Sequence, residues 1–171
     1  FLDNGCIAEG GEFFYLPNEN MLLAGQGRNN LKGAEQMAEK LKVSNLFIIS
    51  SSGYHLDTSI SPIFDNNHDC IGIICAREVF NNNEINNLRS ICISNQWELI
   101  EIEHQNISSS LSFRTAMNAL TLPGLFIGSK KLNQKPISEF ALSNGITFDS
   151  TEVSQFNLSG GSVHCLTNEL F

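Results

Sequence analysis

Basic side chains and long apolar runs are both scarce in this sequence. Its 10 lysines and arginines are outnumbered by 18 aspartates and glutamates, which gives a formal net charge of −8. Binding to nucleic acid relies on a basic surface, so this balance argues against a nucleic-acid partner. Because no run of about eighteen apolar residues occurs, we also expect no membrane-spanning segment and no membrane partner.

Paired cysteines are lacking as well. The 5 cysteines are odd in number, and none stands in a Cys-x-x-Cys pair: Cys6, Cys70, Cys75, Cys92 and Cys165. This usage favours reduced thiols over a disulfide framework or a zinc site, and we expect a cytoplasmic protein. The segments His68-Asp69 and Glu101 to His104 mimic metal ligands in composition, but no third ligand is evident. We therefore expect neither a metal ion nor another cofactor.

A chain of 171 residues with 42% hydrophobic side chains can bury one sizeable core, so we expect a single domain over 1–171. Apolar periodicity and turn residues predict an α/β protein in which the order strand, strand, helix, strand occurs three times. The predicted units are 6–16, 21–26, 30–42 and 46–50, then 55–64, 69–76, 83–95 and 97–103, then 113–122, 124–129, 136–144 and 146–152. Residues 160–171 are expected to form a closing strand. Units of roughly fifty residues with matching element order indicate pseudosymmetry.

The first candidate functional motif runs from Gly160 to Thr167 and contains Cys165. Two glycines precede the cysteine, and glycine lets the backbone approach a ligand closely because it has no Cβ. The adjacent polar His164 predicts an accessible thiol rather than a core thiol. A free cysteine is usually a small buried hydrophobe, so this motif alone leaves both a nucleophile and a packing residue open.

A second candidate motif runs from Tyr54 to Thr58 and contains His55 and Asp57. Residues i and i+2 of a strand point to the same face, so the predicted strand would project both side chains into one site. A cysteine nucleophile needs a proton acceptor and a later proton donor, and histidine is the usual choice near neutral pH. The alternative is a histidine at a strand end beside a solvated carboxylate.

A third candidate motif, Glu9-Gly10-Gly11-Glu12, is followed 19 positions after Glu9 by Arg28 in another glycine-containing turn. A carboxylate beside two glycines suits a cationic ligand that the backbone approaches closely. An arginine can hold a carboxylate with two parallel hydrogen bonds. The alternative is a plain turn or bulge with both charged side chains exposed.

Taken together, the segments Glu-Gly-Gly, Gly-x-Gly-Arg, His-Leu-Asp-Thr and Gly-Gly-Ser-Val-His-Cys-Leu-Thr resemble the guanidino-group modifying enzymes in order and spacing, from Glu9 to Cys165. This superfamily includes arginine deiminases, dimethylargininases, agmatine deiminases and amidinotransferases, and the first two resemble the chain best. The resemblance implies the pentein fold, a five-bladed α/β propeller of ββαβ units, of which about three are visible here. It also implies that an N-terminal portion is lacking, and that a missing segment or a separate chain completes the propeller. A homo-oligomer is also open.

The resemblance implies covalent chemistry without a metal or cofactor on a small cationic guanidine such as arginine. Cys165 would attack the guanidinium carbon as a thiolate. His55 would protonate the departing ammonia or amine and then take a proton from water, giving citrulline or another ureido product. Glu9 and Asp57 would bind and orient the guanidinium N–H groups, and Arg28 would hold the substrate carboxylate.

Three further positions bear on this resemblance. Glu12 stands where the family more often has aspartate, and its extra methylene moves a carboxylate by about 1.5 Å. His164 is implied to shape the site rather than act as the base. Asn118 falls where the family has a pocket-adjacent asparagine. An amidinotransferase and a non-catalytic binding relative remain alternatives, although Glu-Gly-Gly favours the hydrolase.

Overall fold

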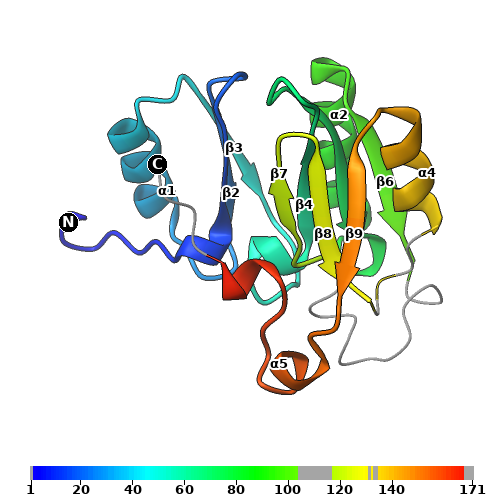
Figure 1. The fold of residues 1–171 in the computed structure, drawn as a ribbon. Helices are drawn as coiled ribbons and strands as arrows, with labels where there is room; N and C mark the ends of the chain where they lie inside the picture. Colours follow the sequence, from blue (N-terminus) through cyan, green and yellow to red (C-terminus); the bar gives the residue numbers. More distant parts are fainter. Residues whose placement is uncertain (1, 104–116, 131, 133–134, 168–171) are drawn as a thin grey trace.

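The computed structural model describes residues 2–103, 117–130, 132 and 135–167, which form three small sheets and the helices that connect their strands (Figure 1). Each sheet has three strands. The first two strands of each sheet are antiparallel, and the third, reached through a helix, runs parallel to the second. The predicted order of strand, strand, helix, strand is confirmed in all three units.

The bounds of the elements follow the predicted ranges closely. The first unit contains β1 (Phe13–Leu16), β2 (Met21–Gly25), α1 (Leu31–Leu41) and β3 (Asn45–Ile49). The second unit contains β4 (Ile60–Phe64), β5 (Cys70–Ala76), α2 (Asn82–Asn95) and β6 (Glu98–Ile102). The third unit contains β7 (Leu120–Leu122), β8 (Leu125–Ser129), α4 (Lys135–Ser143) and β9 (Thr147–Thr151). The short helix α5 (Ser154–Leu158) and four 3-10 turns complete the described chain: η1 (Gly10–Glu12), η2 (Leu56–Thr58), η3 (Arg77–Val79) and η5 (His164–Leu166).

Local chemistry explains where the first two helices begin and end. The Asn30 side chain caps α1 by accepting a hydrogen bond from the Gly33 N–H, and Lys42 ends the helix in the left-handed conformation with φ of 57°. Asn81 and Glu84 form a reciprocal capping box at the start of α2. Such caps satisfy backbone N–H groups that have no partner inside the helix.

Two apolar cores join the three units. In the first core, Ile85 and Leu88 of α2 pack with Leu16 and Leu23 of the first sheet. In the second core, residues of α4 pack with residues of the second sheet, such as Ile137 with Ile74 and Ile102. Helices α2 and α4 therefore share a core both with their own sheet and with the sheet of the preceding unit. Fully burying one such aliphatic side chain stabilises the fold by about 1.5–3 kcal/mol.

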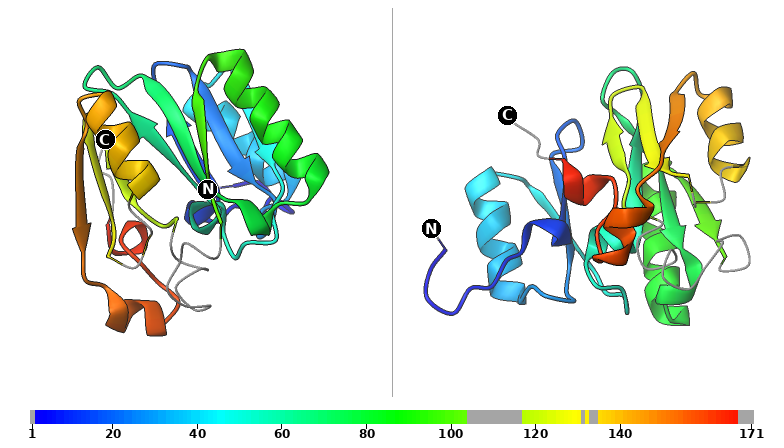
Figure 2. Two further views of the ribbon diagram at one scale, coloured as in Figure 1. Left: turned by 90° about the vertical axis from the view of Figure 1, so that its right-hand side faces the viewer. Right: turned by 60° about the horizontal axis from the view of Figure 1, so that its bottom comes forward.

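The first helix has a different environment from α2 and α4. Apolar periodicity predicts one stripe on this helix, formed by Leu31, Ala34, Met37, Ala38 and Leu41. Ala34 and Ala38 are buried, whereas Leu31 and Leu41 are exposed to 49% and 41%. Figures 1 and 2 show α1 and α4 on opposite sides of the molecule. Among the described residues, no helix is long and apolar enough to cross a membrane.

Four predicted strands are shorter than expected or absent. Within the described residues, the range 113–122 is a strand only over Leu120–Leu122. The range 6–16 is a strand only over Phe13–Leu16, and the range 55–64 only over Ile60–Phe64, because 3-10 turns precede both. The Thr58 hydroxyl donates to the His55 carbonyl at 2.7 Å, and such local side-chain bonds compete with a strand. The closing strand over 160–171 is wrong for the described residues, since His164–Leu166 forms a 3-10 turn. Residues 113–116 of the third unit lie outside the described ranges.

Candidate active site

Most of the predicted site residues lie at turns that precede the first strand of a unit, whereas Arg28 follows β2 and Cys165 lies on η5. The turn η1 comes directly before β1, η2 comes just before β4, and Asn118 lies two residues before β7. The turn η5 returns from the C-terminal end to join them. Figure 1 shows these dark blue, cyan and red turns close together at one end of the sheets. The pseudosymmetry therefore delivers side chains from equivalent positions of three units to one place.

Asp57 is the most buried of the predicted site residues, with 2% of its surface exposed. Its Oδ2 accepts a hydrogen bond from His164 Nδ1 at 2.9 Å, so this histidine nitrogen carries the proton. Cys165 Sγ lies 3.9 Å from the same oxygen, within reach of a weak thiol contact. The other oxygen, Oδ1, is buried and has no hydrogen-bond partner among the described residues. A buried carboxylate oxygen without a donor is uncommon in folded proteins and is one feature of catalytic sites.

Cys165 is an exposed thiol, as the motif predicted. Asn118 fixes the turn that carries it: its Oδ1 accepts from the Cys165 N–H at 3.0 Å, and its carbonyl accepts from the His164 N–H at 3.3 Å. The Asn118 side chain is fully buried, which explains why a predicted site neighbour is instead a support of the thiol. The remaining cysteines are less accessible, because Cys70, Cys75 and Cys92 are buried and Cys6 is partly buried.

Burial makes the three internal thiols poor nucleophiles. It raises the pKa of Cys92 to about 12, and it raises the pKa of Cys70 and Cys75 further. Since the thiolate is the reactive form, these cysteines stay inert near neutral pH. Cys165 is the most accessible thiol among the described residues.

Glu9 forms the second charged centre of the site. Its Oε2 accepts from His55 Nε2 at 2.8 Å and from Arg28 Nε at 2.9 Å. The hydrogen bond from His55 lowers the pKa of Glu9 most, and Arg28 lowers it further, so the carboxylate is ionised at neutral pH. The same contact raises the pKa of Arg28. The Arg28 guanidinium also lies over the Tyr54 ring, 4.7 Å from its centroid.

Gly11 connects the two charged centres. A Cβ at this position would lie 2.7 Å from His55 Nδ1, closer than real Cβ atoms come to another atom, and 3.2 Å from Asp57 Oδ2, a tight contact. The absent side chain thus lets the imidazole and the carboxylate approach η1 from the same side. His55 and Asp57 thus lie on the same side of η1, and a 3-10 turn rather than the expected strand brings them there.

Glu12 is buried and holds the turns that form the site, but it does not line the site. The side chain is 1% exposed. Its Oε1 accepts from the Arg28 N–H at 2.5 Å, and its Oε2 accepts from the Leu56 N–H at 2.9 Å. One buried carboxylate therefore ties the turn of Arg28 to the turn of Asp57. Gly25 leaves room for it, since a Cβ there would overlap Glu12 Oε2.

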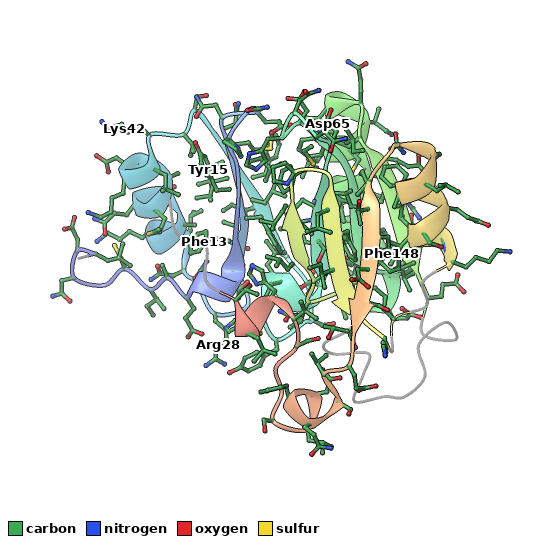
Figure 3. The ribbon with its side chains drawn as sticks, viewed as in Figure 1. Phe13, Tyr15, Arg28, Lys42, Asp65 and Phe148 are labelled. Atoms are coloured by element: carbon green, nitrogen blue, oxygen red, sulfur yellow. The ribbon has the colours of Figure 1, made fainter. Side chains whose placement is uncertain are left out.

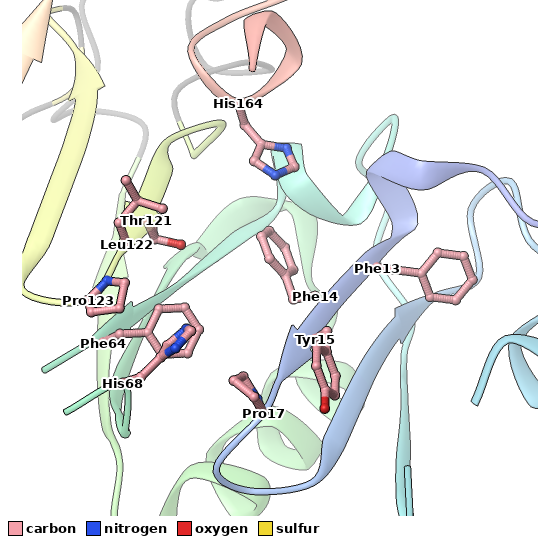
Figure 4. Close-up of a pocket in the computed structure, with 10 residues that line it drawn as sticks. All are labelled: Phe13, Phe14, Tyr15, Pro17, Phe64, His68, Thr121, Leu122, Pro123 and His164. Carbon is pink, nitrogen blue, oxygen red and sulfur yellow. The ribbon is translucent and has the colours of Figure 1, made fainter. Parts of the chain in front are cut away.

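Two hollows border these turns. The first, of about 390 Å³, is mainly aromatic and has His164 at one end beside Phe14, whose ring centroid is 5.7 Å from that of His164 (Figure 4). Cys165 does not line it, so we do not take it as the reaction site. The second, of about 520 Å³, is lined by Arg28, Tyr54 and Thr58 among others. Figure 3 shows the Arg28 side chain at the edge of the molecule, below the blue turn η1.

The segments that mimic metal ligands have other environments. Within the described ranges, no three His, Cys, Asp or Glu side chains gather as a metal site. Glu101 pairs with Arg89 and Arg77, and His68 packs edge-on against the Phe64 ring. His104 lies outside the described residues.

No protein-family model matches the chain, and no curated protein matches its sequence. Solved structures match its fold. The product-bound N-terminal domain of ArgZ, an arginine dihydrolase from the ornithine-ammonia cycle in cyanobacteria, matches with a TM-score of 0.76 and 22% identity over 98% of this chain and 57% of that chain. DDAH from Pseudomonas aeruginosa in complex with citrulline matches with a TM-score of 0.63 and 17% identity, over 94% of this chain and 55% of that chain.

An amidinotransferase has the same fold. SxtG from Microseira wollei, of the saxitoxin biosynthetic pathway, matches with a TM-score of 0.65 and 20% identity, over 91% of this chain and 42% of that chain. This chain therefore spans between 42% and 57% of the length of these three solved chains. At these identities the likeness concerns the fold.

Proposed function

Since the chain has the pentein fold of the guanidino-group modifying enzymes, as its motifs predicted, we propose that it acts as a hydrolase on the guanidino group of arginine or a related guanidine. One observation carries the proposal: Asp57 Oδ1 is buried with no donor among the described residues, while its other oxygen lies 3.9 Å from Sγ of the exposed Cys165. A buried carboxylate needs a hydrogen-bonded cationic partner. A guanidinium supplies planar N–H donors that fit a carboxylate.

The first chemical step follows from that position. A guanidinium bound to Asp57 through its N–H groups brings its carbon beside Cys165 Sγ. The Cys165 thiolate adds to this carbon, and the C–N π electrons move to nitrogen, giving a tetrahedral adduct. Glu9 accepts hydrogen bonds from other N–H groups and orients the carbon toward sulfur.

His55 moves the protons in the following steps. It protonates the departing nitrogen, so ammonia or an amine leaves and an amidino-thioether remains on Cys165. The neutral imidazole then takes a proton from water. The hydroxyl oxygen adds to the amidino carbon, the thiolate leaves, and a ureido product is released. His164 holds Asp57 in place and is assigned no proton transfer.

Two further observations support this proposal. The Glu9–His55 contact gives the imidazole a fixed orientation. The 5 free cysteines agree with a cytoplasmic location, which remains a prediction. We treat 1–171 as one catalytic domain, because continuous apolar cores join its three units.

The test is formation of a ureido product from arginine, methylarginines and agmatine, with Cys165→Ala as the inactive variant and Cys6→Ala as the matched control. We expect product with at least one substrate, full activity in the control and none in Cys165→Ala. Product that persists in Cys165→Ala would refute the mechanism. Transfer of the amidino group that requires an added amine would instead identify an amidinotransferase, and neither product would favour a binding relative.

The roles of the two histidines are separable in the same assay. His55→Gln should lower kcat by about 10²-fold or more, the scale of general acid–base catalysis. His164→Gln should retain more activity, because Asp57 loses one hydrogen bond while the proton carrier stays. The reverse order of effects would assign the acid–base role to His164.

A further inference from the structure

The Arg28 side chain is bound to Glu9, the carboxylate that the proposed function assigns to the substrate guanidinium. The resemblance implies that Arg28 holds a carboxylate and that Glu9 holds a guanidinium. In the structure Arg28 Nε donates to Glu9 Oε2 at 2.9 Å, so the two candidate substrate ligands are bound to each other. The guanidinium of Arg28 is the same chemical group as the reacting part of the substrate.

The Arg28 contact can open without unfolding the site. The Arg28 backbone is anchored by the bond from its N–H to the buried Glu12. Its side chain is 42% exposed and borders the 520 Å³ hollow beside Tyr54. Neither terminal guanidinium nitrogen has a hydrogen bond to a described residue. The side chain can therefore turn from Glu9 toward the hollow while the backbone stays in place.

We propose that Arg28 is a specificity-determining residue that competes with the substrate guanidinium for Glu9 and releases it to guanidines that carry an anionic group. A guanidine with a carboxylate draws Arg28 to that carboxylate and leaves Glu9 free. A guanidine without an anionic group has to displace Arg28 with no new partner for it. Arg28 thus strengthens the binding of guanidines that carry an anionic group and weakens the binding of guanidines that lack one. This inference rests on the proposed function and names the substrate class within it.

The size of the competition is limited by exposure. Glu9 and Arg28 are both about two-fifths exposed, and an exposed ion pair changes an equilibrium by no more than about fivefold. The bond from Arg28 to a substrate carboxylate is charge-assisted and bidentate, so its loss weakens binding by about tenfold or more.

The experiment measures the dissociation constants of methylguanidine and arginine by NMR titration in Cys165→Ala, which prevents turnover. The same titrations are repeated with Arg28→Gln added, and with Arg89→Gln as a matched control. Arg89 is an arginine of similar exposure that pairs with Glu101 outside the site. We expect Arg28→Gln to tighten methylguanidine by about two- to fivefold and to weaken arginine by about tenfold, while Arg89→Gln changes neither.

Each outcome has a distinct meaning. Unchanged or weaker methylguanidine binding in Arg28→Gln would overturn the competition and leave the proposed function standing. If both ligands bind more tightly in Arg28→Gln, Arg28 does not bind the anionic group of the substrate, which also overturns the inference. If neither ligand binds to any variant, the proposed function fails and the inference fails with it. Circular dichroism spectra that match for all variants establish that folding is unaffected.

Discussion

Gly25 and Glu12 form a pair whose energetic coupling can be worked out from the structure. The Glu12 carboxylate is buried and accepts from the N–H groups of Arg28 and Leu56, at 2.5 Å and 2.9 Å. A Cβ on residue 25 would overlap Glu12 Oε2 and would lie 2.9 Å from the Leu56 Cβ. The glycine is therefore required because the carboxylate passes where a side chain would be.

The magnitudes follow from these two bonds. Glu12→Ala removes a charged acceptor from both N–H groups, and hydrogen bonds to charged groups contribute about 1.5–3 kcal/mol each. We expect a loss of at least about 3 kcal/mol in the free energy of unfolding. Gly25→Ala in the native background displaces the carboxylate and should cost about 2–4 kcal/mol. In the Glu12→Ala background the overlap disappears, and only the Leu56 contact remains.

The assay is a double-mutant cycle in urea, with the free energy of unfolding measured for the native protein, both single variants and the double variant. Gly25→Ala should lower the free energy of unfolding by about 1–3 kcal/mol less in the Glu12→Ala background than in the native background. Gly10→Ala is the matched control, since nothing lies within 4 Å of a Cβ at that position. Costs for Gly25→Ala and Glu12→Ala that add within about 0.5 kcal/mol would refute the reasoning.

Three further predictions concern the thiols and their support. Iodoacetamide should label Cys165 first and leave Cys70, Cys75 and Cys92 unmodified in the folded protein, as peptide mapping would show; rapid labelling of Cys92 would contradict the burial. Burial raises the pKa of Cys92 to about 12. The contribution of this protonated thiol to the free energy of unfolding is therefore fully present below about pH 9 and is lost as the pH rises toward 12. Urea midpoints should thus fall between about pH 8.5 and 10.5, less so in Cys92→Ala, and a flat profile would be contrary evidence. Asn118→Ala should lower kcat by about tenfold with little change in KM, because the Cys165 N–H loses its acceptor; an unchanged kcat would remove Asn118 from the positioning of the thiol.

The arrangement of strands and helices was predictable because it depends on short-range patterns. Alternating apolar segments and turn residues located all three units, and Asn30 and Lys42 bounded the first helix to within a residue. The apolar stripe of α1 was predicted less well. Periodicity identifies a face but does not tell which neighbour covers it, and Leu31 remains 49% exposed.

The geometry of the site was only partly predictable. The motifs placed His55, Asp57 and Cys165 correctly in one region, but the strand assumed for the first two is a 3-10 turn closed by Thr58. The pairing of Asp57 with His164 spans 107 residues, and that of Asn118 with Cys165 spans 47. Such long-range contacts have no local signature. A useful signal was present nonetheless: Asn118 precedes its strand as Asp57 and Glu12 precede theirs.

The two carboxylates of the site differ in a way that divides their proposed tasks. Each holds a histidine, but Asp57 is 2% exposed and the Glu9 side chain is 41% exposed. Electrostatic attraction is stronger where water is excluded, so a guanidinium gains most of its orientation from Asp57, beside the thiol. Glu9 lies in higher dielectric and binds its partners weakly enough to exchange them. A carboxylate that fixes the reacting carbon and a second that can change partners would together allow tight positioning without tight retention of the product.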